Sequence, residues 1–170
     1  MKIYTRNGDA GQTDLLAAGR VAKDHYRVEA LGEIDELNCA LGMVRALGAS
    51  PEEDAVLESV QKTLFRIGSE LACPAPEDMG LTKIGGGEIL ALEELADRYS
   101  EKLSPFQWVF PSGPPAAAAC QLARAVCRRA ERRVVTAVRE SDGEVSGEIA
   151  RYLNRLSDFL FVFGRFLGER

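Results

Sequence analysis

Apolar residues recur at steps of three and four along five stretches of this chain, and this spacing constrains the fold more than any other feature of the sequence. The period is that of one helix face, so each stretch predicts an amphipathic α-helix that buries a single apolar stripe. Apart from the short run Trp108–Phe110, no alternating pattern predicts a strand instead. The expected helices cover His25–Leu47, Ser50 to Pro74, Ile89–Leu103, Ala116–Arg139 and Val145–Leu167.

Turn and cap residues separate the five stretches. Ser50 offers an N-cap hydroxyl, Pro51 suits the first helical position and Glu53 completes a capping box. Pro114 and Pro115 fit only the first turn of the fourth helix. We therefore expect an all-α fold, in which residues 24–170 form a five-helix bundle after an irregular, glycine-containing N-terminal segment, residues 1–23. The 170 residues contain no linker or low-complexity region, so a single domain is expected.

Composition argues against several classes of protein. No apolar run approaches the roughly 20 residues that cross a bilayer, and the first residues do not resemble a signal peptide, so a cytoplasmic protein without a membrane partner is expected. A net charge of -5 argues against a nucleic-acid partner, because phosphate affinity needs an excess of Lys and Arg. The four cysteines form no Cys-x-x-Cys pair and there is one histidine, which makes a Cys/His metal site implausible and favours buried thiols.

The N-terminal segment carries residues that a helical bundle alone does not explain. Two glycines three positions apart allow the backbone to turn so that successive N–H groups converge, while threonine hydroxyls and basic side chains nearby favour an anion. These residues are Thr5, Arg6, Gly8, Gly11, Thr13 and Lys23. The segment can therefore cradle phosphates, although it lacks the Gly-Lys-Ser/Thr ending of a P-loop. The alternative is a turn-rich terminus that binds nothing.

The fourth predicted helix carries an excess of arginine. Six arginines and one glutamate lie between positions 124 and 139, so acidic partners on the same helix are too few to balance the cations. Four residues share one face at positions i, i+4, i+7 and i+8, namely Arg124, Arg128, Glu131 and Arg132. We infer an anionic ligand or acidic residues of a partner subunit. A solvated charged face is the alternative.

Polar residues interrupt two of the apolar stripes. Asn154 and Asp158 share a face of the fifth predicted helix, and Asp35 and Asn38 interrupt the stripe of the first. Polar groups among core positions need hydrogen-bond partners. Those partners are either other residues of the bundle or a ligand, and the residues alone leave both open.

Six segments of the chain occur in the order found in a known family. They read TRNGDAGQT from Thr5, RVAK from Arg20, IDELN from Ile34, FPSG from Phe110, RAVCRRAER from Arg124 and NRLSD from Asn154. Together they resemble the PduO-type ATP:cob(I)alamin adenosyltransferases. The resemblance covers nearly all of the chain from Ile3 to Phe166. No single segment is decisive, but six in register are.

The resemblance implies a homotrimer of helical bundles that transfers the 5'-deoxyadenosyl group of ATP to the cobalt of cob(I)alamin. Each ATP would bind between the N-terminal segment of one subunit and the arginine helix of its neighbour. Asp35 and Arg124 match a pair that joins subunits, and Trp108 falls where the family has an aromatic residue below the corrin ring. The positions that match ATP contacts are Thr5, Arg6, Asn7, Gly8, Thr13, Asp14, Lys23, Arg128, Glu131, Arg132 and Asn154.

The implied catalysis is mostly positioning and charge neutralisation, since cob(I)alamin is a nucleophile that needs no general base. Arg128, Lys23 and Mg2+ are expected to stabilise the leaving triphosphate, and Trp108 to displace the lower axial ligand of cobalt. A reductase and an adenosylcobalamin-dependent client enzyme are implied partners. One alternative is a trimeric carrier or sensor that binds ATP or adenosylcobalamin with little turnover. Another is a helical assembly module, which leaves the N-terminal glycines unexplained.

Two residues depart from the pattern of the family. Asp14 stands where serine or threonine is usual near the phosphates, and Asn7 replaces a usual threonine. A carboxylate at position 14 is expected to repel triphosphate unless a magnesium ion bridges the two.

Overall fold

The computed structural model describes residues 4–16, 18–105 and 110–170, and within these ranges the chain contains five α-helices. They are α1 (Tyr26–Ala46), α2 (Pro51–Ala72), α3 (Gly86–Ser100), α4 (Pro115–Glu140) and α5 (Gly147–Glu169). The prediction of five helices is therefore confirmed. The predicted capping box of α2 is also present, because the Ser50 hydroxyl accepts the Glu53 N–H at 3.4 Å and the Glu53 carboxylate accepts the Ser50 N–H at 2.6 Å.

The connection from α2 to α3 differs from the prediction. It contains a short 3-10 helix, η1 (Pro76–Met79), and α3 begins at Gly86, before the predicted start at Ile89. The Glu88 carboxylate accepts the Gly85 N–H at 3.1 Å, which satisfies one of the free donors at the start of α3. This local cap offsets the low helix propensity of glycine.

The N-terminal segment is not irregular throughout, so an all-α description is wrong for it. Strand β1 (Gln12–Leu15) pairs with strand β2 (Gly19–Ala22) in an antiparallel hairpin, and Asp14 lies opposite Arg20. Gly19 has a φ of 72°, which glycine adopts without a steric penalty. Each strand has four residues, too few for an alternating pattern to stand out in the sequence.

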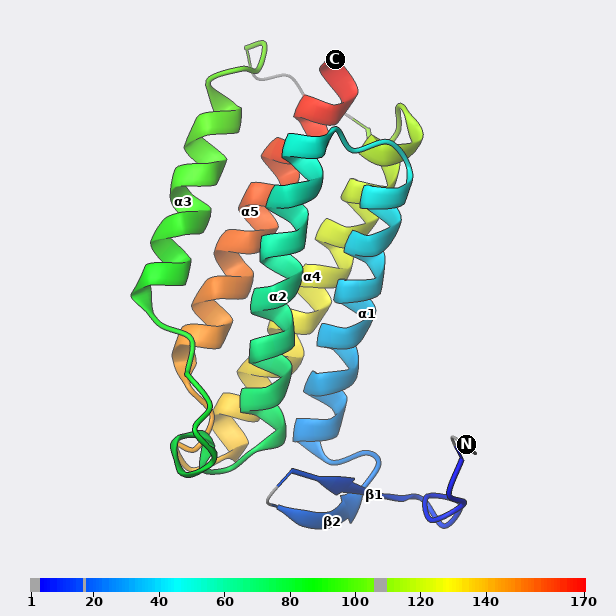
Figure 1. Cartoon of the computed structure of the whole chain (residues 1–170), viewed down its shortest axis with the longest axis vertical. Helices are drawn as coiled ribbons and strands as arrows, with labels where there is room; N and C mark the ends of the chain where they lie inside the picture. Colours follow the sequence, from blue (N-terminus) through cyan, green and yellow to red (C-terminus); the bar gives the residue numbers. More distant parts are fainter. Residues whose placement is uncertain (1–3, 17, 106–109) are drawn as a thin grey trace.

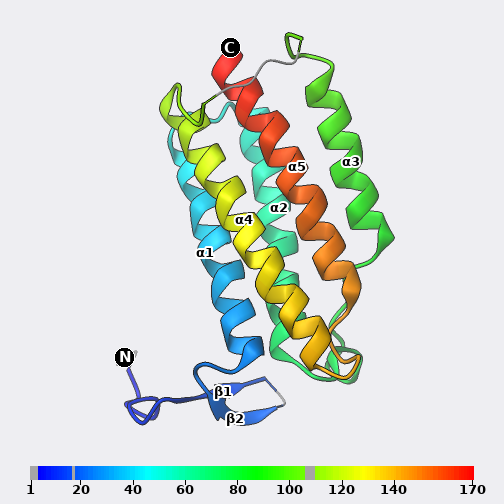
Figure 2. The same ribbon diagram turned by 180° about the vertical axis from the view of Figure 1, so that it is seen from behind.

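Successive helices run in opposite directions, and the hairpin lies beyond the first turn of α1, outside the bundle (Figure 1). α1 packs against α2 and α4, α4 also packs against α5, and α3 packs against α5. The view from behind shows α4 beside α5, with the C-terminus at the end of the bundle opposite to the hairpin (Figure 2). In the described ranges, no helix is long and apolar enough to span a membrane.

The inward stripes of the helices form one apolar core, which also contains cysteines. All four cysteines lie in the described ranges. Cys73, Cys120 and Cys127 are buried, whereas Cys39 is exposed, so the prediction of buried thiols is wrong for Cys39. The Cys120 thiol donates to the Leu160 carbonyl at 3.3 Å, and burial raises the pKa of Cys120 to about 12. The buried thiols therefore behave as small core side chains.

A buried arginine fixes the end of the bundle that carries the hairpin. Arg27 is 2% exposed, and its guanidinium donates to the Leu71 carbonyl at 3.0 Å and to the Glu144 carboxylate at 2.6 Å. These contacts join the start of α1 to the end of α2 and to the turn between α4 and α5. Because the hairpin directly precedes α1, Arg27 also fixes where the N-terminal segment leaves the bundle. Sequence reasoning missed this residue.

Candidate functional site

The turn before β1 places a glycine against a lysine. A Cβ atom added at Gly8 would lie 3.2 Å from the Lys23 Nζ, so the ammonium group sits directly against this turn. The Lys23 N–H donates to the Gly11 carbonyl at 2.9 Å, which holds the end of β2 beside the same turn. The structure therefore brings Gly8 and Lys23 together, as the phosphate-binding interpretation requires.

The other candidates of this segment lie on the same turn or on the hairpin. Arg6 adopts a left-handed conformation with a φ of 64°, and its carbonyl accepts the Asp9 N–H at 3.3 Å. The Asn7 N–H donates to the Thr5 hydroxyl at 3.4 Å, and Thr13 is half-buried on β1. Hydroxyl, amide and cationic groups thus surround one exposed turn, a combination that suits an anion.

Asp14 has a cation of its own. Its carboxylate lies 3.6 Å from the Arg20 guanidinium across the hairpin, and Arg20 also donates to the Asn7 carbonyl at 2.7 Å. Sequence reasoning expected Asp14 to repel phosphate and did not identify Arg20 as its partner. The strand register could have identified Arg20, because it places the two residues opposite each other. The register can be assigned only once the hairpin is known.

Two arginines of α4, which we call the paired arginines, are balanced by glutamates of α1. The Arg129 guanidinium donates to Glu33 at 2.7 Å and to Glu36, and Arg133 lies 3.3 Å from Glu29. The hydrogen bonds to Glu36 and Glu33 raise the pKa of Arg129 further above its usual value. The predicted excess of arginine is therefore wrong for these two residues, because it counted acidic residues on the same helix only.

Arg128 and Arg132, which we call the open arginines, have no carboxylate within ion-pair distance among residues 4–16, 18–105 and 110–170. Both side chains are exposed. The Arg132 guanidinium donates to the Arg128 backbone carbonyl at 3.0 Å, so the two cations lie on adjoining turns of α4. Two adjacent arginines with this geometry suit a polyanionic ligand.

Glu131 and Asn154 form a polar contact between α4 and α5. The Asn154 amide donates to the Glu131 carboxylate at 3.0 Å, and its carbonyl oxygen accepts from Arg155 at 2.9 Å. Arg155 also lies 3.9 Å from Asp158. The bundle thus supplies partners for Asn154 and Asp158. Both Glu131 and Asn154 nevertheless border a hollow of about 330 Å³, whose other lining residues are Ile89, Ala150, Arg151 and Arg155.

Asp35 and Arg124 are both described, and they form no ion pair with each other within the chain. Arg124 donates to the Gln121 side chain at 2.8 Å. Asp35 is exposed and borders, with Asn38, a groove of about 510 Å³ between α1 and α2. Phe65 lines the same groove and is 73% exposed. Asp35 is therefore placed where a second molecule can reach it.

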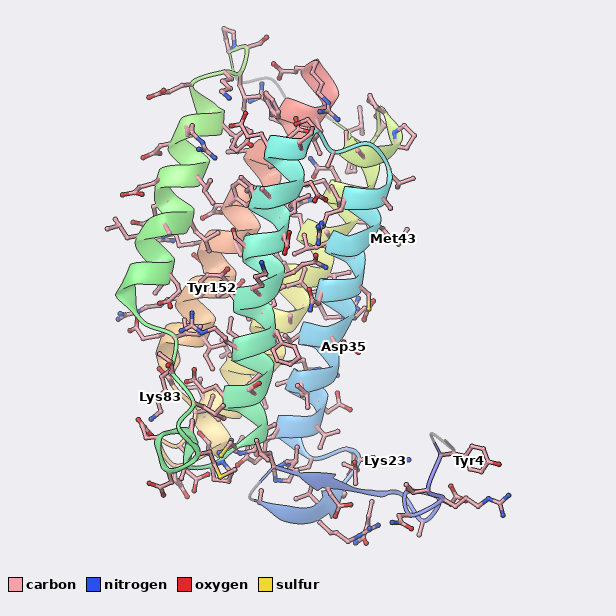
Figure 3. All side chains as sticks on the ribbon, in the orientation of Figure 1. Tyr4, Lys23, Asp35, Met43, Lys83 and Tyr152 are labelled. Atoms are coloured by element: carbon pink, nitrogen blue, oxygen red, sulfur yellow. The ribbon has the colours of Figure 1, made fainter. Side chains whose placement is uncertain are left out.

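The candidate residues fall into two separate groups within one chain. Tyr4 and Lys23 lie beyond the end of α1, while Asp35 lies part-way along that helix (Figure 3). Across the described ranges, no hydrogen bond or ion pair joins the N-terminal segment to the candidates of α4 and α5. Trp108, the expected residue below the corrin ring, lies outside the described residues.

The described part of the chain holds no group of three or more His, Cys, Asp or Glu side chains that could bind a metal ion. Mg2+ keeps oxygen ligands and is commonly held by substrate phosphates together with one or two carboxylates. The residues present therefore fit a magnesium ion that arrives on a phosphate ligand better than one bound by a protein cage.

The fold of this chain is similar to solved structures. The chain superposes on a variant of the PduO-type ATP:corrinoid adenosyltransferase from Lactobacillus reuteri, complexed with cobalamin and ATP, with a TM-score of 0.90 and 34% identity. The match covers 99% of this chain and 91% of that one.

Relatives of known sequence agree with the structural comparison. The chain is 40% identical to the corrinoid adenosyltransferase PduO of Salmonella typhimurium, over 97% of this chain and 49% of that protein, so it spans about half the length of this relative. It is also 40% identical to a corrinoid adenosyltransferase of Mycobacterium leprae, over 96% of this chain and 90% of that protein. Residues 3–167 match the family described as cobalamin adenosyltransferase. The chain therefore belongs to the cobalamin adenosyltransferase family.

Proposed function

We propose that this chain transfers the 5'-deoxyadenosyl group of ATP to the cobalt of cob(I)alamin, with adenosylcobalamin and triphosphate as products. The observation that carries this proposal is the division of the site into two cationic groups, one around Gly8 and Lys23 and one around the open arginines. A triphosphate that touches both groups accounts for each of them. The cobalamin and ATP bound by the Lactobacillus reuteri relative support this choice of substrates.

The two groups would meet between subunits of a homotrimer, since they lie apart within one chain. The groove between α1 and α2 supports self-association, because it is lined mainly by apolar side chains and one of them, Phe65, is 73% exposed. Asp35 borders this groove, and Arg124 of the partner subunit is the cation we propose for it. The proposed ATP contacts are Thr5, Arg6, Asn7, Gly8, Thr13, Asp14 and Lys23 of one subunit and Arg128, Glu131, Arg132 and Asn154 of the next.

The proposed reaction is a displacement at the 5' carbon of ATP. An electron pair of cobalt forms the cobalt–carbon bond, while the bond from that carbon to the phosphate oxygen breaks and its electron pair leaves with triphosphate. No proton leaves the nucleophile, so no general base is needed. The protein holds the two reactants in line, and Lys23 and Arg128 stabilise the charge that develops on the leaving group. A magnesium ion on the phosphates adds further positive charge there.

Activity is tested with purified protein, magnesium-ATP and chemically reduced cobalamin, by following the visible spectrum for the cobalt–carbon bond. We expect adenosylcobalamin and an equal amount of triphosphate. ATP binding without any product would instead favour a carrier or sensor. A reductase and an adenosylcobalamin-dependent client enzyme are the further partners we propose, and the same assay run with each of them shows whether turnover or product release increases.

The trimer is tested through the proposed subunit pair. Asp35→Arg should shift the mass measured by light scattering from trimer toward monomer or aggregate, and adding Arg124→Asp should restore the trimer in part. Asp97→Arg changes an exposed residue of α3 and serves as the matched control, since α3 does not border the groove. An unchanged trimer in the Asp35 variant would count against the pair.

Trp108 is proposed to occupy the lower face of the corrin, so that cobalt loses its lower axial ligand and cob(II)alamin becomes easier to reduce. Trp108→Ala should then leave the alkylation of ready-made cob(I)alamin largely intact. It should nearly abolish turnover that starts from cob(II)alamin and a weak reductant. Equal loss in the two assays by a folded protein would refute this role.

A further inference from the structure

Arg20 makes three contacts at the base of the turn that carries Asn7 and Gly8. Its guanidinium lies 3.6 Å from the Asp14 carboxylate, donates to the Asn7 carbonyl at 2.7 Å and reaches the Gln12 side chain at 3.5 Å. The Arg20 side chain is 40% exposed and that of Asp14 is 67% exposed. One side chain therefore connects β2 to β1 and to the turn before it.

The contact with the Asn7 carbonyl fixes a second group as well. A carbonyl and the N–H of the next residue belong to one planar peptide unit and point in opposite directions when the bond is trans. The described chain contains no cis peptide bond. Arg20 therefore fixes the direction of the Gly8 N–H. No hydrogen bond of that N–H is found within the described ranges, and Gly8 lies against the Lys23 ammonium.

The contact with Asp14, on β1, changes the charge beside the same turn. A carboxylate beside a bound triphosphate repels it, and the repulsion falls when a cation lies against the carboxylate. The Arg20 guanidinium is placed directly across the hairpin from Asp14. Together the two contacts give a turn with a fixed N–H donor and less negative charge beside it.

We infer that Arg20 is a positioning residue of the ATP site, which neutralises Asp14 and aims the Gly8 N–H through the Asn7 carbonyl. This inference rests on the proposed function of the turn in triphosphate binding. Arg20 acts through Asp14 and Asn7 and does not itself bind the phosphates. Its importance therefore depends on whether residue 14 is a carboxylate.

A double-mutant cycle tests this dependence with magnesium-ATP as the probe. The dissociation constant is measured by calorimetry for the unaltered protein, Arg20→Ala, Asp14→Ser and the double variant. Arg20→Ala should raise the dissociation constant about tenfold when Asp14 is present and about threefold when Ser is at position 14, because only the contact with Asn7 then remains to be lost. Arg20→Lys keeps the charge but lacks the forked donor of arginine. Its dissociation constant should lie between those of the unaltered protein and Arg20→Ala.

Backbone nuclear magnetic resonance relaxation provides a second measurement without any ligand. Arg20→Ala should lower the order parameter of the Gly8 N–H, because its peptide unit is no longer held. Arg139→Ala is the matched control, since Arg139 pairs with Glu140 on the exposed end of α4, and it should change neither the order parameter nor the affinity.

Three results would overturn the inference. An equal loss of affinity with Asp or Ser at position 14 would mean that Arg20 does not act through Asp14. An unchanged affinity and an unchanged Gly8 order parameter in Arg20→Ala would mean that the pair of Arg20 and Asp14 only holds the hairpin. If the unaltered protein bound no ATP, both the proposed function and this inference would be wrong. If it bound ATP but the effects of the two substitutions were additive, only this inference would be wrong.

Discussion

The paired and the open arginines of α4 are the same residue type at neighbouring positions of one helix, yet their surroundings are opposite. Arg129 and Arg133 contact three glutamates of α1. Arg128 and Arg132 each lie one residue earlier, and no carboxylate in the described ranges reaches them. A step of one residue turns a side chain by roughly 100° about the helix axis. Because of that rotation, the paired arginines face α1, whereas the open arginines face a surface that a ligand can reach.

The difference shows that the neighbouring helix, α1, determines which arginines of α4 are neutralised. The glutamates of α1 lie at positions 29, 33 and 36, a spacing that keeps them on one face. That face meets α4 along the seam between the two helices and neutralises only the cations that point toward it. An arginine outside the seam keeps its full charge for an anion, and such a guanidinium is a strong bidentate donor to phosphate.

Replacing an open arginine should have the largest effect. Arg128→Ala is expected to lower kcat/KM for ATP at least about 30-fold, or about 2 kcal/mol, because one charge-assisted donor to the leaving triphosphate is lost. The fold should be unaffected, since the side chain is exposed. Steady-state kinetics with varied ATP and a thermal melt measure the two effects. Near-normal kcat/KM in the variant would mean that Arg128 does not bind ATP. The functional distinction between the open and the paired arginines would then be wrong.

The positions of the helices could be predicted because their signals are local. The apolar period and the caps at Ser50 and Glu53 act within one or two turns, so sequence alone places α2 correctly. The hairpin could not be predicted, because strands of four residues carry no clear period and are held by pairing across a turn. The contacts of Arg27 were missed for a similar reason, as they join three elements that are distant in sequence.

The proximity of the candidate residues within each group was predictable to the same extent. Arg128, Glu131 and Arg132 lie close together because they share one helix, and Gly8 and Lys23 because a short hairpin brings them together. The partners of these residues were not predictable. Which arginines of α4 are neutralised depends on the neighbouring helix, and the cation of Asp14 depends on strand register.

A buried carboxylate provides the opposite case to the open arginines. Glu70 is 3% exposed, accepts the Ile84 N–H at 2.9 Å and has no ion pair in the described part of the chain. Burial raises its pKa, although the Ile84 hydrogen bond and the nearby Lys83 and Arg66 oppose the shift. An unbalanced charge is thus tolerated at the surface for Arg128 but is disfavoured inside the bundle for Glu70.

The raised pKa of Glu70 predicts a dependence of stability on pH. Below the ordinary pKa of a glutamate, about 4.3, the carboxyl is protonated in both states and contributes nothing. As the pH rises through that value toward the raised pKa of the folded state, the unfolded chain ionises first, so the free energy of unfolding falls by about 1.4 kcal/mol for each unit of pKa difference. Glu70→Gln should remove this part of the loss as the pH rises above the ordinary pKa of a glutamate, as measured by urea denaturation.

Glu58 offers a control of opposite sign. Its pKa is lowered, chiefly by the hydrogen bond from Lys62 on the exposed face of α2. Ionised Glu58 therefore stabilises the fold above its ordinary pKa, and this contribution is lost as the pH falls. Glu58→Gln should lower stability at neutral pH and leave it unchanged in acid. The same pH profile for the Glu58 and Glu70 variants would contradict both assignments.

The smallest effect is expected for a paired arginine, and it is the result that could break the comparison. Arg133 lies 3.3 Å from Glu29, and the two side chains are 52% and 40% exposed. Exposed ion pairs of this kind contribute between zero and about 1 kcal/mol, because water screens the charges and both long side chains lose freedom. Arg133→Ala should therefore change the free energy of unfolding by less than about 0.5 kcal/mol, with a smaller change in high salt.

Arg133→Ala should also leave kcat/KM for ATP within about twofold, since a guanidinium already held by Glu29 adds little to the binding of an anion. The measurement is made beside Arg128→Ala under the same conditions, so that both variants remove one positive charge from α4. If Arg133→Ala weakened the reaction as much as Arg128→Ala, the net charge of the helix would govern ATP binding, and the orientation of each arginine relative to α1 would not.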